Sequence, residues 1–326
     1  ATVRAMTGRE SKMPSHPSPL RYPGGKHALA PLLADILVCN DLHDGTVVEP
    51  FAGGAGASLR LLFDEFASEL LLNDTDSRIY AFWRSVLNQT DELVRRIRKV
   101  SVTMTTWRRC RTVYDAGVSR RKQLDIAFAT FFLNRCDRSG ILMDGGPIGG
   151  YEQTGKWKLD ARFNRDDLIA RIRRIASYRD RIKVTRLNAY ELLKRLPVSG
   201  ERLLVYLDPP YYEKGQRLYL NSLEHEDHEK LAKLLLSDPP FRWVLTYDNV
   251  SAIRKLYGSL PLRSFELHYS AYRRTVGREL IIFDPRLDVP QEILRKNNRA
   301  GRLRFGRAIK PGRLKDPRNA KDCLTG

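Results

Sequence analysis

Short apolar runs alternate with amphipathic segments in two parts of the chain, residues 19–90 and 195–285. In the first part, TVVEPF and ELLLND have the length and composition of buried strands, and each is followed by apolar residues at helical spacing. In the second part, RLLVYLDPP and RWVLTYD are followed by the helical patterns HEDHEKLAKLLLSD and NVSAIRKLYG. Regular alternation of this kind predicts an α/β fold around a largely parallel sheet.

Two further strands close this pattern. RSFELHYSAY and RELIIFDP are separated only by the short segment RRTVGR, which is long enough for a turn but not for a crossover helix. The two strands are therefore predicted to be antiparallel, which makes the sheet mixed.

Residues 91–194 differ from both parts, because helical patterns dominate and basic residues are dense. DELVRRIRKV, RKQLDIAFATFFLNR and DDLIARIRRIASYRDRI each suit a helix. The glycine-rich section DGGPIGGYEQTGKWKLDARF lies between the last two and has a hairpin-like pattern. This block interrupts the alternation of strands and helices, so we interpret it as a domain inserted into one discontinuous α/β domain.

The two ends of the chain lack apolar periodicity. Residues 1–18 are polar, without the apolar core of a secretory signal, and are predicted to form a flexible leader. Residues 286–326 hold 12 Lys or Arg against 4 Asp or Glu, a composition that predicts a flexible basic tail.

The formal net charge is +19, which indicates a polyanionic partner, nucleic acid before an acidic membrane surface. General solubility is the alternative explanation. No apolar run is long enough to span a membrane. The four cysteines lack CxxC spacing, which favours a reducing cytoplasm over a disulfide framework or a zinc site. The cluster HEDH, residues 225–228, suits the first turn of a helix better than a metal site, so no metal is expected.

A glycine cluster, EPFAGGAGAS, follows the first strand. Glycines there let the backbone approach a ligand at a helix N-terminus. The chain has no GxxxxGK[ST] motif and lacks the third glycine of GxGxxG, which argues against an NTPase and a dinucleotide site. Asp74 ends the next strand, where it either accepts hydrogen bonds from ribose hydroxyl groups or caps a helix, a role that Asp76 also suits. These features favour an adenosine-type cofactor, S-adenosylmethionine more than NAD.

The second chemical motif is DPPY, formed by Asp208, Pro209, Pro210 and Tyr211 after an apolar run. The amine of a nucleobase is a poor nucleophile until acceptors engage both of its N–H groups. Asp208 offers one acceptor and the Pro209 carbonyl offers the other, in a direction that the prolines fix. Tyr211 offers a flat face on which an extruded base would gain about 1–3 kcal/mol by stacking. The motif therefore suits a clamp for a flipped amino-base; a proline-rich turn with an exposed tyrosine is the alternative.

In this order, LRYPGGK, VVEPFAGGAG, LLLNDTD, FFLNRCDRSGIL and VYLDPPY resemble the motifs of the Dam-like DNA adenine-N6 methyltransferases, the D12 class or alpha group, over roughly residues 19–285. The resemblance implies a class I S-adenosylmethionine-dependent methyltransferase fold, a Rossmann-like mixed sheet with an inserted helical and hairpin target-recognition domain at 91–194. It also implies that Asp208, Pro209, Pro210 and Tyr211 hold the target amine. The residues implied for the cofactor are Tyr22, Lys26, Glu49, Pro50, Phe51, Gly53, Gly54, Gly56, Asp74 and Asp208.

The resemblance implies direct methyl transfer from S-adenosylmethionine to adenine N6 in duplex DNA, in a cytoplasmic enzyme of a bacterium or phage with a restriction endonuclease as a candidate partner. The chain departs from the family in two places: the spacing within FAGGAG, and the lack of the Asn-Gly-rich stretch of GATC-reading relatives. GATC specificity therefore does not carry over. Three alternatives remain: methylation of cytosine N4, methylation of an RNA base, and a DNA-binding relative without catalytic activity. A catalytic motif that begins with Ser would favour the cytosine reaction.

The expected DNA contacts lie in the insert, where arginine suits guanine, lysine suits phosphate, and the glycine-rich section suits a groove or the gap left by an extruded base. The candidates are Asn134, Arg135, Arg138, Lys156, Trp157 and Lys158. Other arginines of the insert, such as Arg95 and Arg96, are expected to coat helices or to contact phosphate. The basic tail would add affinity that is independent of sequence.

Overall fold

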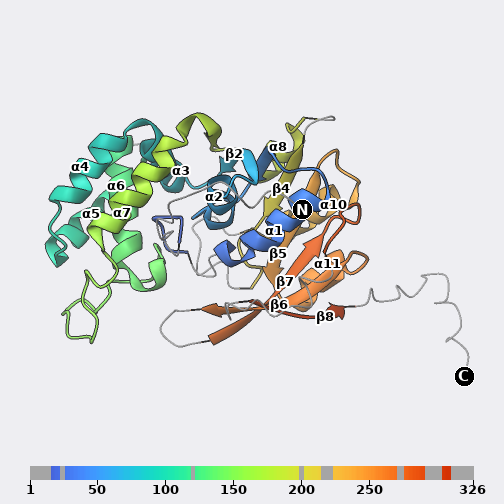
Figure 1. The fold of residues 1–326 in the computed structure, drawn as a ribbon. Helices are drawn as coiled ribbons and strands as arrows, with labels where there is room; N and C mark the ends of the chain where they lie inside the picture. The colour runs from blue at the N-terminus through green and yellow to red at the C-terminus, as the bar shows by residue number, and fades with distance from the viewer. Residues whose placement is uncertain are drawn as a thin grey trace, which may run out of the picture.

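A computed structural model describes residues 16–22, 26–118, 122–197, 202–213, 223–269, 275–290 and 303–309. Eight strands of these residues form one sheet in the order β3-β2-β1-β4-β5-β7-β6-β8 (Figure 1). The strands are β1 (Gly45–Glu49), β2 (Ala67–Asn73), β3 (Ile182–Thr185), β4 (Leu203–Leu207), β5 (Arg242–Asp248), β6 (Leu262–Tyr269), β7 (Thr275–Phe283) and β8 (Leu303–Ile309). The strands β1 to β5 are mutually parallel, and β7 lies antiparallel between β5 and β6.

The central strands are apolar throughout because both faces of the sheet are covered. Along β1 and β4, Val47 and Leu204 belong to one buried cluster, whereas Val48 and Val205 belong to the other. Helices α1 (Ala30–Cys39), α2 (Gly56–Phe63) and α3 (Ser77–Asn88) contribute to the first cluster, and α8 (Ala189–Lys194), α10 (His225–Leu236) and α11 (Ser251–Tyr257) to the second. The predicted α/β fold with a mixed sheet, the class I methyltransferase arrangement, is confirmed.

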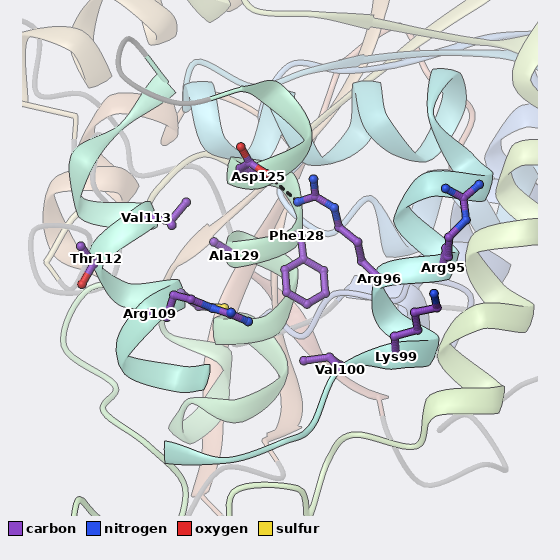
Figure 2. Close-up of a pocket in the computed structure, with 11 residues that line it drawn as sticks. Arg95, Arg96, Lys99, Val100, Arg109, Thr112, Val113, Asp125, Phe128 and Ala129 are labelled. Carbon is purple, nitrogen blue, oxygen red and sulfur yellow. Dashed lines mark hydrogen bonds and ion pairs between the residues drawn. The ribbon is translucent and has the colours of Figure 1, made fainter. Parts of the chain in front are cut away.

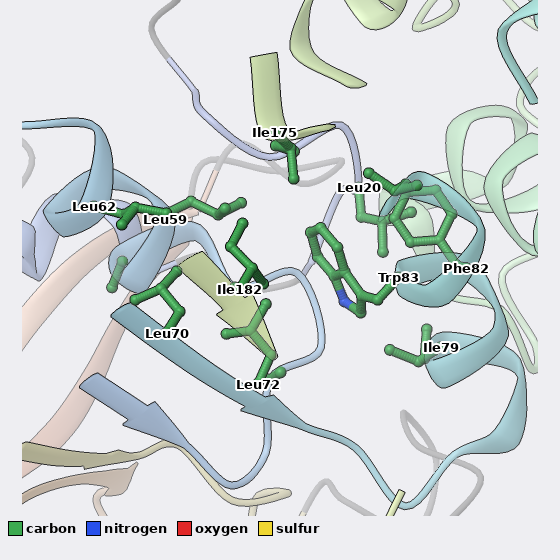
Figure 3. Packing of buried hydrophobic residues seen from close by; sticks show 14 of the residues in the cluster. Leu20, Leu59, Leu62, Leu70, Leu72, Ile79, Phe82, Trp83, Ile175 and Ile182 are labelled. Carbon is green, nitrogen blue, oxygen red and sulfur yellow. The ribbon is translucent and has the colours of Figure 1, made fainter. Parts of the chain in front are cut away.

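Four helices build the insert at one end of the molecule: α4 (Thr90–Lys99), α5 (Met104–Ala116), α6 (Gln123–Cys136) and α7 (Arg165–Ser177) (Figure 1). The insert shares its core with the sheet domain. Phe82 of α3 stacks on Phe131 of α6, with ring centroids 6.1 Å apart, and Figure 3 shows Trp83 and Ile175 among the residues that face the leucines of β2. One continuous apolar cluster therefore joins the two parts.

The structure corrects three boundaries. The strand β3 pairs with β2, so the sheet resumes at Ile182, within the range 91–194 assigned to the insert. The strand β8 pairs with β6, so part of the range 286–326 is not a free tail. At the other end, residues 17–20 are buried, although residues 1–18 were expected to form a flexible leader; residues 1–15 lie outside the described ranges.

The expected hairpin is also wrong. Between α6 and α7 all residues are described, and they form turns, the short 3₁₀ helix η3 (Arg138–Gly140) and a single bridge between Asp137 and Pro147, with no pair of strands. Glycines 146, 149 and 150 there have φ values of 60°, 90° and 81°, a backbone that favours turns over strands. Across the described ranges, no helix has the length and apolar character that a membrane span requires.

Candidate active site

Acidic residues end four neighbouring strands at one edge of the sheet. Glu49 ends β1, Asp74 follows β2, Asp208 follows β4, and Asp248 ends β5. Since these strands are parallel, their carboxyl ends share an edge, where ligands of open α/β sheets bind. The structure thus brings the glycine cluster, Asp74 and DPPY to one edge of the sheet.

The glycine loop after β1 is packed against Tyr22. Gly53 has φ 45°, and a Cβ atom there would lie 2.7 Å from the Tyr22 ring, while one at Gly54 would lie 3.2 Å from it. The Gly53 carbonyl accepts a hydrogen bond from Trp83 Nε1 at 2.9 Å. At Gly56, where α2 begins, the nearest atom would be 3.5 Å away. Of these three positions, Gly53 is therefore the one that most requires glycine.

Neighbouring side chains contact the rest of this motif. The Pro50 carbonyl accepts a hydrogen bond from Asn73 Nδ2 at 2.9 Å, and Phe51 is half-buried against the second apolar cluster. Glu49 is buried, and among the described residues no group hydrogen-bonds its Oε2. Burial raises the pKa of Glu49 to about 8, against the opposing effect of the nearby Ser58 hydroxyl group.

Asp74 links the glycine loop to the start of α3. Its Oδ2 accepts from the Gly53 N–H and its Oδ1 from the Asp76 N–H, both at 2.9 Å. Burial raises the pKa of Asp74 to about 7, and repulsion from Asp76 adds to this shift. Asp76 is the helix cap, accepting from Arg78 N at 2.8 Å. Because Asp76 takes the capping role, each Asp74 oxygen keeps a further lone pair for a ligand.

Asp208 lies in a buried charge network. Lys26, in the 3₁₀ helix η1 (Lys26–Leu29), places its Nζ 3.1 Å from Asp208 Oδ1 and 3.0 Å from Glu279 Oε2. Thr246 of β5 donates to the same Asp208 oxygen at 2.7 Å. No described residue forms a hydrogen bond or ion pair with Asp208 Oδ2, although the side chain is 24% exposed. One oxygen of Asp208 is thus held by the protein and the other is open.

The pKa values in this network follow from burial and from two carboxylates around one ammonium. Burial raises the pKa of Asp208, and Glu279 adds to the shift while Lys26 opposes it. Burial disfavours the charge on Lys26, but Asp208 and Glu279 outweigh that effect and raise the pKa of Lys26 well above its usual value. Lys26 is therefore charged throughout the physiological range.

Tyr211 does not present the exposed ring that its sequence suggested. It is 7% exposed, donates its hydroxyl proton to Glu279 Oε1 at 2.7 Å, and accepts from Lys26 Nζ at 3.4 Å. Pro209 is buried and Pro210 half-buried. Tyr212 is the more exposed ring of the two; its N–H donates to Asp248 at 2.9 Å, and its hydroxyl group lies 2.8 Å from His225 Nδ1.

Sequence reasoning missed Glu279, Thr246 and Asp248. A charge within the apolar strand RELIIF is the signal that marked Glu279, and the acid that ends RWVLTYD is the signal that marked Asp248. Thr246 carries no such signal. The HEDH cluster is the first turn of α10, as predicted, with a capping box between Glu224 and Asp227 and with His228 Nδ1 2.7 Å from the Tyr247 hydroxyl group.

The insert holds the segment that carries Tyr22. Asn134 is fully buried, accepts from Arg21 N at 2.6 Å, and donates to the carbonyl oxygens of Arg21 and Gly140 at 2.7 and 3.0 Å. With its amide so engaged, Asn134 offers no group to DNA, and this expectation is corrected. Arg135 is partly buried: its guanidinium donates to the carbonyl oxygens of Arg162 and Pro19, and burial lowers its pKa to about 9.

The other four candidates for DNA contact lie at the surface, between α6 and α7. Arg138, Lys156 and Lys158 are exposed, and Trp157 is 63% exposed. Lys156 Nζ lies 5.8 Å from the Trp157 ring centroid, and Lys158 Nζ donates to the Gln153 carbonyl at 2.6 Å. We call residues 141–163 the recognition loop; it is the green loop that extends from the insert in Figure 1. Its other exposed large apolar side chains are Met143 and Tyr151.

A groove with a cavity volume of about 720 Å³ lies between α4, α5 and α6 (Figure 2). Its floor is apolar and its edges are cationic; the lining residues include Arg95, Arg96, Lys99, Val100, Arg109, Val113, Phe128 and Ala129. Arg96 is paired with Asp125 at 2.6 Å. In the described part of the chain, no acidic group lies within ion-pair distance of Arg95, Lys99 or Arg109, which suits the phosphate contacts considered for this surface.

The sequence profile of the D12 class N6 adenine-specific DNA methyltransferases matches residues 22–276. A search of curated proteins gave no match. A solved structure from Legionella pneumophila is similar over 89% of this chain and 98% of its own, with 10% identity and a TM-score of 0.40. A putative methyltransferase from Escherichia coli is similar over 79% of this chain and 86% of its own, with 12% identity and a TM-score of 0.29. At these scores neither structure supports a conclusion about the site.

Proposed function

The chain belongs to the D12 class of N6 adenine-specific DNA methyltransferases, and we propose that it methylates adenine N6 at a specific site in duplex DNA after the base is extruded. The observation that carries the proposal is the asymmetry of Asp208. Lys26 and Thr246 hold Oδ1, and Oδ2 is open at the strand edge where the glycine loop and Asp74 also lie.

S-adenosylmethionine would supply the methyl group, carried on a positively charged sulfonium. The residues present suit such a group. Glu49 Oε2 has no hydrogen-bond partner among the described residues and can accept one from the cofactor, Gly53 and Gly54 let the Tyr22 ring pack closely on the loop, and Asp74 has lone pairs for ribose hydroxyl groups. Pro50, Phe51 and Gly56 complete the proposed cofactor surface. Lys26 was expected to contact the cofactor, but its ammonium is engaged by Asp208 and Glu279, so we assign it to the catalytic carboxylate.

The target amine would be activated by two acceptors. Asp208 Oδ2 accepts one N–H and the Pro209 carbonyl accepts the other, so that electron density is returned to the nitrogen. When the nitrogen gains a methyl group it must lose a proton, and Asp208 Oδ2 is the base within reach. Burial and Glu279 raise the pKa of Asp208, which makes it a stronger base for that proton. Tyr211 would shape the floor of this pocket.

The recognition loop would contact duplex DNA. Trp157 offers a flat apolar face beside Lys156 and Lys158, the combination that stacks on bases and neutralises phosphates. Arg138 would join them. The excess of basic residues in the whole chain supports the same partner.

The test is methylation-sensitive long-read sequencing of plasmid DNA from cells that express the wild type, Asp208→Ala or Asp91→Ala. Asp91 is an exposed carboxylate in the first turn of α4 and serves as the matched control. We expect N6-methyladenine within one recurrent motif for the wild type and Asp91→Ala, and none for Asp208→Ala. Methylation confined to cytosine N4, or its absence from DNA altogether, would contradict the proposal and favour the cytosine, RNA or inert alternatives.

A further inference from the structure

Glu279 is a charged residue in the interior of an apolar strand. It is 2% exposed, and β7 places it opposite Asp248 of β5. A carboxylate at such a depth is unfavourable unless charged or polar partners compensate for lost water. Both oxygens have such partners: Oε1 accepts the Tyr211 hydroxyl proton at 2.7 Å, and Oε2 lies 3.0 Å from Lys26 Nζ.

The network contains one ammonium and two carboxylates, so it carries an excess negative charge when all three groups are ionised. The Lys26 ammonium is shared among three groups: its Nζ lies 3.1 Å from Asp208 Oδ1 and 3.0 Å from Glu279 Oε2, and it donates to the Tyr211 hydroxyl group at 3.4 Å. Without Glu279, the ammonium would be free to turn fully toward Asp208 and neutralise both of its oxygens. The division of Lys26 between two carboxylates is what confines it to one oxygen of Asp208.

We propose that Glu279 is a positioning residue for methyl transfer: it shares Lys26 with Asp208 and holds the Tyr211 hydroxyl group, and so keeps Asp208 Oδ2 open and electron-rich toward the substrate amine. This inference rests on the proposed function. Glu279 itself does not touch the amine, and it acts through Lys26, Asp208 and Tyr211.

The role has an electrostatic signature. Burial raises the pKa of Asp208, Lys26 lowers it, and Glu279 raises it again. The other titratable groups whose charges act on Asp208 or are acted on by it are Glu49 of β1, Tyr206 of β4 and Tyr247 of β5. Glu279→Gln removes the negative charge of Glu279 and leaves these other groups unchanged. The pKa of Asp208 should therefore fall, and the acidic limb of the pH–kcat profile should move to lower pH.

The experiment compares Glu279→Gln with Glu266→Gln, an identical change at a more exposed carboxylate on β6, 3.5 Å from Arg278. We expect Glu279→Gln to lower kcat by roughly 10- to 100-fold, the loss typical of a charged hydrogen bond. Its acidic limb should move to lower pH, with the dissociation constant for S-adenosylmethionine within about threefold of the wild type by calorimetry. Glu266→Gln should change none of these.

Urea unfolding supplies a readout that is independent of turnover. Glu279→Gln and Lys26→Met should be strongly non-additive, since each removes the same ion pair, whereas Glu266→Gln and Lys26→Met should add. An active wild type with a Glu279→Gln profile that matches Glu266→Gln, or with additive unfolding effects, would overturn the inference and leave the proposed function standing. A wild type without methylation activity would overturn the proposed function, and the inference with it.

Discussion

The proposed active site at the sheet edge and the recognition loop differ in how their polar and aromatic side chains are placed. In the proposed active site, Lys26, Tyr211 and Glu279 are buried and bonded to one another. In the loop, Trp157 and Tyr151 are exposed, and Lys156 Nζ lies 5.8 Å from the Trp157 ring centroid. A site for one reaction is organised before the substrate arrives, whereas a surface for a polymer leaves its apolar and charged groups open to the partner. Substitutions should therefore separate chemistry from DNA affinity.

The largest effect is expected where the backbone of the proposed active site is most constrained. Gly53→Ala would place a Cβ atom 2.7 Å from the Tyr22 ring at a φ of 45°. The clash and the strained backbone should displace the loop that Asp74 holds, and weaken S-adenosylmethionine binding by about 100-fold or more, which corresponds to roughly 3 kcal/mol. Calorimetric titration measures this. Gly117→Ala is the matched control: Gly117 follows α5 with a φ of 71°, and its Cβ would meet no atom within 4 Å, so this variant should bind S-adenosylmethionine nearly as the wild type does.

A smaller effect is expected for Tyr211→Phe. As an exposed stacking ring, Tyr211 would tolerate this change; as a buried hydroxyl bonded to Glu279 and Lys26, it should not. We expect kcat to fall by roughly 10-fold, since a hydrogen bond to a charged group is lost. Steady-state kinetics on duplex DNA checks this, with Tyr212→Phe, whose hydroxyl bond to His225 is exposed, as the control. Unchanged turnover in Tyr211→Phe would return Tyr211 to the stacking role.

A substitution in the recognition loop is expected to change DNA affinity alone. Trp157→Ala should weaken duplex binding by about 1–3 kcal/mol, the range of base–aromatic stacking, without affecting S-adenosylmethionine binding. Fluorescence anisotropy of labelled duplex measures the first quantity and calorimetry the second. Leu236→Ala removes an exposed apolar side chain from α10 and should change neither. A loss of cofactor affinity in Trp157→Ala would show that the two regions are not separable.

The smallest effect is expected from the C-terminal end. Removal of residues 310–326 spares β8 and deletes 5 Lys or Arg and 2 Asp or Glu. We expect a modest loss of DNA affinity that disappears at high salt, with the methylated motif unchanged, because such charges act on phosphates without reading bases. Binding at two salt concentrations and sequencing of methylated DNA test this. An altered motif in the truncated protein would contradict it.

Local patterns made much of this structure predictable. The strand TVVEPF, the glycine cluster and DPPY are contiguous in sequence, and their chemistry follows from short-range rules. Two strands with weak sequence patterns were not predicted. IKVT of β3 is only four residues long, and the segment around β8 is rich in basic residues, which is atypical of a strand. The environments of Glu279 and Asn134 could not be predicted, since Glu279 bonds to Tyr211, 68 residues away along the chain, and Asn134 to Arg21, 113 residues away. Such partnerships are set by topology.

The single core that joins α3 and α6 has a consequence for changing the target sequence. Asn134 accepts from the N–H and donates to the carbonyl of Arg21, the residue that precedes Tyr22. The insert is therefore not structurally independent: exchanging it whole would disturb the segment that supports the proposed cofactor surface. New specificities should arise more readily by replacement within the recognition loop, whose ends are anchored by α6 and α7, than by exchange of complete domains.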